Sequence, residues 1–213
     1  MKFVLSYSFG KDSTLCLHKM IEEGHTPVGL IVMVNEEAER SFFHGVDYDL
    51  MNRISEALEI PLLIGKTKGP DYAKVMESKL IEAKELGAAV AVFGDIDIMD
   101  HQIWCNDRCK EAGIDSYFPL WNKDREEIVS EIMELGYDCL IKAINNEKLN
   151  RSVLGKKISP ELIDIFKEYK IDVCGEEGEY HTVVVGGPIF KHKVEYKLGD
   201  MLDFGVTSVI EID

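Results

Sequence analysis

Apolar runs of strand length alternate along this chain with segments of helical periodicity, and this alternation constrains the fold more than any other feature. Residues 3–7, 28–34, 60–64 and 88–93 are β-prone apolar runs. Continuous hydrophobicity of this length is typical of strands covered on both faces. Strands that alternate with helices predict a parallel sheet, and right-handed crossovers make it doubly wound. The intervening helices are expected at residues 14–23, at 47–58, at 71–86 and through Trp104 and Cys109.

The second half of the chain has a different character, which begins near Trp121. We expect a nucleotide-binding α/β domain over residues 1–120 and a smaller α+β domain over 121–213, packed closely because no Pro/Gly linker separates them. Residues 65–69 are expected as a loop and residues near 117–118 as a short strand. The elements expected in the second half are a helix at 123–135, a strand at 139–144, a helix starting at Ser159-Pro160, a hairpin of 182–185 with 193–196 around Gly186-Gly187-Pro188, and a strand at 206–212.

Composition excludes several classes of protein. The net charge of -15 argues against a broad nucleic-acid surface, which needs clustered Lys and Arg. No apolar run approaches the roughly 20 residues that cross a bilayer. The chain starts directly with an apolar strand and carries five widely spaced cysteines. We therefore expect no signal peptide, reduced thiols and a cytoplasmic location.

The turn at residues 8–13 follows the first strand and opens the first helix. Its N–H groups are the unpaired donors of a helix N-terminus, which favours a phosphate or pyrophosphate. Gly10 permits close backbone approach, Ser8 and Ser13 supply hydroxyls, and Lys11 supplies a cation. The turn is not a Walker A loop, because Asp12 follows the lysine; an acid beside a phosphate suggests a bridging Mg²⁺. An ordinary helix cap is the alternative interpretation.

Residues elsewhere converge on this turn if the strands lie in the spatial order third, second, first, fourth, fifth. Ligands of doubly wound sheets bind where the strand order reverses, between the first and fourth strands. Gly94 and Asp95 end the fourth strand, so Asp95 is a candidate Mg²⁺ ligand or substrate contact. Met33, at the end of the second strand, is a candidate for packing on an adenine ring. A chain turn at Gly94-Asp95 and a plain core methionine are the structural alternatives.

A second dense cluster spans residues 174–182, with three glutamates, a tyrosine and a histidine just before a strand. Glu176 and Glu179 are candidates for binding a cationic group, and Tyr180 for a cation–π contact with it. His181 or a glutamate is a candidate for proton transfer. A solvated acidic loop is the alternative.

The turn Ser8-Phe9-Gly10-Lys11-Asp12-Ser13 resembles the PP-loop of the ATP pyrophosphatase superfamily, in which glycine commonly stands where this chain has Phe9. The bulkier side chain must therefore point away from the phosphates. Within that superfamily the chain resembles the diphthine–ammonia ligase family over nearly its whole length. That family's last motif often reads CGEGGEYET; here Glu177 replaces a glycine and His181 a glutamate. Three stretches carry the resemblance: Gly94-Asp95-Ile96 with His101 and Trp104, Phe118-Pro119-Leu120-Trp121 with Asp124, and residues 174–180. In addition, His44 lies where relatives carry polar residues.

The resemblance implies a fold of the adenine nucleotide alpha hydrolase (HUP) type and an amide ligase that uses ATP and Mg²⁺. A substrate carboxylate attacks the α-phosphate, pyrophosphate leaves, and ammonia converts the acyl-adenylate into an amide. The implied substrate is diphthine, a modified histidine on a translation elongation factor, or another carboxylate. His44, His101, Glu176, Glu179, Tyr180 and His181 would then be catalytic or substrate-binding residues. The oligomeric state, including a homo-oligomer, stays open.

Two other functions remain to be separated from a ligase. A PP-loop tRNA thiolation enzyme generally uses cysteine pairs and a basic surface, whereas this chain is acidic and has no CxxC. A nucleotide-sensing module would bind ATP on the same loop without turnover. Exchange of pyrophosphate into ATP upon adding a carboxylate would distinguish the ligase from the sensor.

Overall fold

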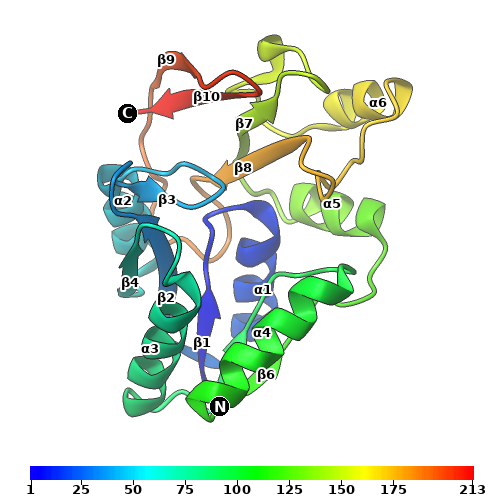
Figure 1. Ribbon diagram of the computed structural model, residues 1–213. Helices are drawn as coiled ribbons and strands as arrows, with labels where there is room; N and C mark the ends of the chain where they lie inside the picture. The colour runs from blue at the N-terminus through cyan, green and yellow to red at the C-terminus, as the bar shows by residue number, and fades with distance from the viewer.

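The computed structural model describes residues 1–213 and has two sheets, one above the other in Figure 1. The first half builds a mainly parallel sheet in which β4, β2, β1, β5 and β6 lie side by side in that order. This is the predicted strand order, and it places the order reversal between β1 and β5. Its elements are β1 (Lys2–Ser6), α1 (Lys11–Glu22), β2 (Thr26–Asn35), β3 (Arg40–Ser41), α2 (Tyr48–Leu58), β4 (Leu62–Thr67), α3 (Tyr72–Glu85), β5 (Val90–Val92), α4 (Met99–Ala112) and β6 (Asp115–Tyr117).

Side-chain alternation along the strands explains how this sheet is covered. Phe3 and Leu5 of β1 pack in the larger core with α1 and α2, whereas Val4 packs in a second core with α3 and α4. Each face of the sheet therefore has its own pair of helices, as expected when strands are apolar on both sides. β3 adds a short antiparallel pair to β2 beyond the end of β1.

The second half forms an antiparallel sheet in the order β8, β7, β10, β9. The larger core runs without interruption into this half, where Ile128 of α5 and Ile141 of β7 belong to it together with Phe3. The two halves thus share one hydrophobic core. The elements of the second half are α5 (Arg125–Glu134), β7 (Cys139–Asn145), η1 (Arg151–Val153), α6 (Pro160–Glu168), β8 (Tyr180–Val184), β9 (Leu198–Asp203) and β10 (Thr207–Ile212).

Three sequence expectations need correction. The predicted hairpin is wrong: β8 pairs with β7, and residues 193–196 form no strand, only a backbone bond from Val194 N to Val185 O. The Tyr137 ring lies so close to Gly187 that a Cβ there would be 2.1 Å from it, so the chain leaves the sheet at this point. β4 continues through residues 65–67, which were expected as a loop, and β9 was not expected at all.

The remaining expectations about the chain's regular structure hold closely. Ser159 caps α6 by accepting a hydrogen bond from Leu162 N, with Pro160 in the first turn. All five cysteines are free and buried. None of the helices combines the length and the apolar character needed to cross a membrane.

Candidate active site

A cavity of about 330 Å³ lies at the order reversal, between the two halves of the chain. Its walls come from the turn before α1, the ends of β2 and β5, the segment 41–44, and the segment 174–182 that leads into β8. Residues that are distant in the sequence therefore meet at the carboxyl ends of the parallel strands, where doubly wound folds bind ligands.

The turn before α1 is held in shape by its own serines. Ser8 Oγ lies 3.1 Å from Ser13 Oγ and accepts a hydrogen bond from Gly10 N at 3.3 Å. The N–H groups of Asp12 and Ser13 have no partner within the chain, so they remain available at the positive end of the helix. Gly94 lies directly against this first turn, because a Cβ at Gly94 would come within 3.1 Å of Ser13 N.

Phe9 occupies a left-handed backbone conformation, with φ of 67°. That conformation suits glycine, which explains the glycine commonly found here in PP-loops. The Phe9 side chain is fully buried and packs on the Tyr7 ring, with ring centroids 4.9 Å apart. It does not line the cavity, so the chain keeps the loop's backbone path while directing the aromatic ring into the core.

Three contacts attach this turn and the neighbouring His44 to the second half of the chain. Lys11 N donates to Thr182 Oγ1 at 3.0 Å, and Val184 N donates to Phe9 O at 2.9 Å. His44 Nδ1 donates to Thr182 O at 2.7 Å. The turn before α1 is therefore anchored on β8 as well as on α1.

The Lys11 side chain is almost completely buried, at 4% exposure. Its ammonium contacts Asp12 Oδ2 at 2.8 Å and lies 5.7 Å from the centroid of the Tyr180 ring. Burial is the largest single effect and opposes the charged form, but Asp12, Cys174, Tyr180 and Glu176 together raise the pKa of Lys11 well above its ordinary value. Lys11 is therefore a permanent cation at the cavity wall.

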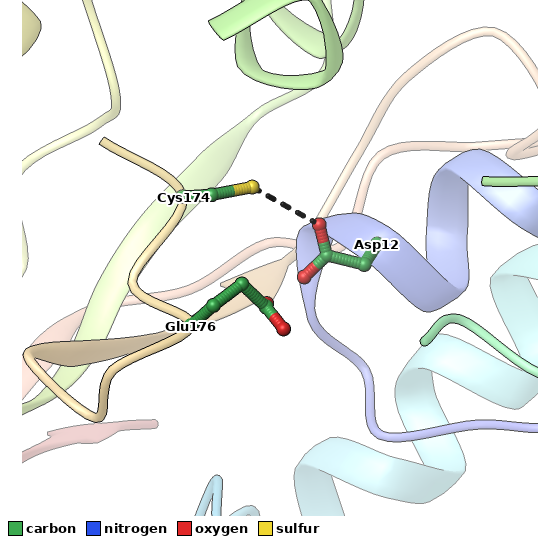
Figure 2. Close-up of side chains that lie close together, drawn as sticks. All are labelled: Asp12, Cys174 and Glu176. Atoms are coloured by element: carbon green, nitrogen blue, oxygen red, sulfur yellow. Dashed lines mark hydrogen bonds between the residues drawn. The ribbon is translucent and has the colours of Figure 1, made fainter. Parts of the chain in front are cut away.

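Asp12 faces the loop of residues 172–179, called the acidic loop below, across the cavity. Figure 2 shows Asp12 at the start of α1, with the Cys174 thiol directed at its carboxylate and Glu176 beside them. Cys174 Sγ lies 3.8 Å from Asp12 Oδ1, and ligand atoms of all three side chains lie within 4.8 Å of one another. Burial, and next the charge of Asp12, raise the pKa of Glu176 to about 7. Burial also keeps Cys174 a thiol by raising its pKa.

Two histidines lie beside the turn before α1. His44 Nδ1 contacts the Thr182 carbonyl oxygen, which can only accept a hydrogen bond, so Nδ1 carries the proton. The neutral ring therefore presents Nε2 as an acceptor. The His181 ring lies 4.8 Å from it, and burial lowers the pKa of His44 to about 4 and that of His181 to about 3. His44 also packs over Gly10, where a Cβ would lie 2.4 Å from its Cε1.

At the end of β5, Asp95 lines the cavity and burial raises its pKa. His101 Nδ1 lies 3.5 Å from Asp95 Oδ1, and the thiol of Cys105 contacts Oδ2 at 3.7 Å. Met33 lines the same cavity from β2 and is 6% exposed. The structure therefore brings the predicted nucleotide-side residues to one place.

Two residues of the acidic cluster lie differently from the expectation. Glu179 is 3% exposed, points away from the cavity lining and pairs with Lys148 at 3.2 Å. Tyr180 is equally buried; its hydroxyl donates to Val173 O, and the cation on its ring is Lys11. Tyr180 is the first residue of β8, a strand in which every residue except His181 is buried, and Glu179 directly precedes it.

Sequence reasoning did not single out Thr182, Arg125 or Asp172. Thr182 was inside the dense cluster, but a threonine in a predicted strand gave no sign that it caps the PP-loop. Arg125 and Asp172 hold the acidic loop, with Arg125 Nη1 donating to Asp172 Oδ2 at 2.5 Å. No sequence pattern marked that pair, because the contact joins segments that only the tertiary fold brings together.

The fold and the cavity at its order reversal define a doubly wound α/β protein with a PP-loop-like turn after its first strand. Two family models match the sequence: the diphthamide synthase N-terminal domain at residues 1–116 and the diphthamide synthase C-terminal domain at residues 124–213. The chain belongs to the diphthamide synthase family.

Relatives with assigned names agree with this family. A diphthine–ammonia ligase of Schizosaccharomyces pombe is 24% identical over 91% of this chain, which spans only 36% of that relative. One from Bos taurus is 26% identical over 91% of this chain and 82% of the relative. A solved structure of a predicted subunit of tRNA methyltransferase from Methanocaldococcus jannaschii is 17% identical, covering 88% of this chain and 98% of that one, with a TM-score of 0.49. Similarity at that level is too weak to support a conclusion about activity.

Proposed function

We propose that this chain is an ATP-dependent carbon–nitrogen ligase that converts a substrate carboxylate into an amide with ammonia, as the name diphthine–ammonia ligase states for its relatives. The observation that carries the proposal is the meeting of the PP-loop-like turn and the acidic loop at one cavity, with Asp12 facing Glu176. A pure nucleotide-binding module needs the first of these two segments but not the second.

The turn before α1 is suited to hold a pyrophosphate that is leaving. In the proposed first step a carboxylate oxygen bonds to the α-phosphorus, and the bond from that phosphorus to the pyrophosphate oxygen breaks. The N–H groups of Asp12 and Ser13 and the Lys11 ammonium lie where this charge develops. Preorganised donors of this kind stabilise the transition state more than the ground state.

The residues at the cavity fit a Mg²⁺ ion bound with the nucleotide. Mg²⁺ prefers hard oxygen ligands, and the carboxylates of Asp12 and Glu176 approach each other, with Asp12 also paired with Lys11. Burial, and next the charge of Asp12, raise the pKa of Glu176, and a bound cation would favour its ionised form. Asp12 and Glu176 would hold the ion, with Asp95 nearby; the protonated Cys174 thiol is a poor ligand for it. When bound, the ion would neutralise phosphate charge.

The acceptor side of the cavity would carry the second step. Ammonia bonds to the acyl carbon, AMP departs with the electrons of the broken bond, and the nitrogen loses a proton. The neutral His44 presents Nε2 as an acceptor for that nitrogen's N–H, with His181 beside it. The substrate would be a carboxylate such as diphthine on a translation elongation factor, whose cationic group would face the acidic loop beyond the ion.

Partial reactions test the proposal. With ATP, Mg²⁺ and a peptide bearing diphthine, the protein should exchange labelled pyrophosphate into ATP, and ammonia should yield the amide and AMP. Lys11→Met should weaken ATP binding at least tenfold, because it removes the cation at the phosphate site. Lys142→Met is the matched control: Lys142 is also buried, but it bonds to Ile210 O in the second sheet. Tight ATP binding without exchange for any carboxylate would show a sensor instead.

A further inference from the structure

One arginine outside the cavity connects the two loops that form the cavity's walls. Arg125 is the first residue of α5. Its guanidinium donates two parallel hydrogen bonds of 2.8 Å to Asp97, from Nε to Oδ2 and from Nη2 to Oδ1. Its third nitrogen, Nη1, donates to Asp172 Oδ2. Asp97 belongs to the loop after β5, two residues beyond Asp95, and Asp172 begins the acidic loop.

Asp172 connects Arg125 to the backbone of the acidic loop. Its Oδ1 accepts from Cys174 N at 3.1 Å, and its Oδ2 accepts from Glu176 N at 2.9 Å. Asp172 therefore fixes the two residues of the loop that face Asp12. The link runs from Asp97 through Arg125 and Asp172 to Glu176, with a hydrogen bond at every step.

We propose that Arg125 is a positioning residue whose guanidinium holds the acidic loop against the PP-loop-like turn, so that Cys174 and Glu176 face Asp12. Its role in catalysis rests on the proposed function, whereas its role in holding the loop does not. Arginine suits this task because its planar fork engages one carboxylate bidentately and still offers a donor to a second. The short ammonium of a lysine cannot reproduce the fork.

The Cys174 thiol reports directly on this loop. Cys174 is 1% exposed, and its loop has to open before an alkylating reagent reaches it. Cys16 and Cys139 are equally buried but lie in α1 and β7, outside the loop, so they report on global opening. Iodoacetamide labelling of the full chain, resolved by peptide mass spectrometry, measures all three rates in one experiment.

Arg125→Gln should raise the labelling rate of Cys174 at least tenfold while Cys16 and Cys139 keep their wild-type rates. Arg125→Lys keeps the charge without the fork and should give an intermediate rate for Cys174. Arg53→Gln is the matched control: Arg53 is also 28% exposed and also joins the two halves, through Glu195 O, but contacts neither loop. It should leave Cys174 protected.

Three results would overturn the proposal: Cys174 stays protected in Arg125→Gln, all three thiols become reactive together, or Arg125→Lys protects Cys174 as well as arginine does. A ligase assay adds a second readout, in which Arg125→Gln should lower kcat for the amide at least tenfold with little change in ATP affinity. If the wild type makes no amide but Arg125→Gln selectively exposes Cys174, the proposed function fails and the positioning role stands.

Discussion

At the scale of single residues, Phe9 shows how the chain reconciles two opposing effects. A non-glycine residue in the left-handed region costs about 1–2 kcal/mol, and Phe9 has φ of 67°. Full burial of a phenylalanine ring offsets this cost, since its removal typically destabilises a protein by about 3–5 kcal/mol. The ring's contribution is the larger, which explains why phenylalanine is tolerated at a position suited to glycine.

Two substitutions at Phe9 separate these effects. Phe9→Ala should lower the free energy of unfolding by roughly 3–5 kcal/mol, because it removes the ring and keeps the strain. Phe9→Gly removes the ring too but relieves the strain, so it should be more stable than Phe9→Ala by about 1 kcal/mol. Urea denaturation of both variants measures the difference. Equal stability, or a more stable alanine variant, would mean that the backbone at residue 9 is unstrained.

At the scale of elements, the loop after β3 and the strand β8 meet through His44 and His181. Both rings are neutral in the folded protein because burial lowers their pKa to about 4 and about 3, below the ordinary 6.5. Between these values the unfolded chain binds more protons than the folded one. The stabilising effect of this contact is therefore complete above pH 6.5 and is lost as the pH falls toward 4.

His44→Gln should weaken this pH dependence. At pH 5 the preferential protonation of the unfolded state lowers the free energy of unfolding by about 1 kcal/mol for one histidine, after allowance for partial solvent screening. Thermal or urea unfolding of wild type and variant between pH 7.5 and 5 measures it, and His25→Gln, at the opposite end of α1, is the control. A variant whose stability falls with acid as steeply as the wild type would contradict the buried, neutral state of His44.

Elements formed by interactions between residues close in the sequence were predictable, and those that depend on distant partners were not. The buried strands of the first sheet, their order and the turn at residues 8–13 follow from apolar runs and crossover rules, which are local or topological. The predicted hairpin was wrong because β8 pairs with β7 and not with residues 193–196, which are nearer in the sequence. Glu179 was expected in the site because it belongs to the dense cluster at residues 174–182, yet it is buried and paired with Lys148, which is partly exposed. No local pattern encodes such partners.

At the scale of the whole molecule, the two halves depend on each other. They share one hydrophobic core, and the turn that binds phosphate in our proposal is anchored on Thr182 and Val184 of β8. Burial of apolar surface dominates the stability of a domain. The predicted boundary near residue 120 therefore separates two sheets that are not expected to be independent folding units.

A fragment of residues 1–120 should fail to bind ATP and should lack a cooperative thermal transition, because the shared core loses Ile128 of α5 and Ile141 of β7 and the turn loses its Thr182 anchor. Calorimetry and ATP titration of the fragment, beside the full chain, measure both properties. A fragment that melts cooperatively and binds ATP with the affinity of the full chain would show that β8 contributes nothing to the turn.

The anchorage of the PP-loop-like turn on β8 also affects the order of events during synthesis. The turn leaves the ribosome well before β8, because Thr182 follows Lys11 by 171 residues. A nascent chain therefore cannot complete the proposed nucleotide site until β8 has also been translated. Products that stop before β8 would carry the turn without its anchor on Thr182 and Val184.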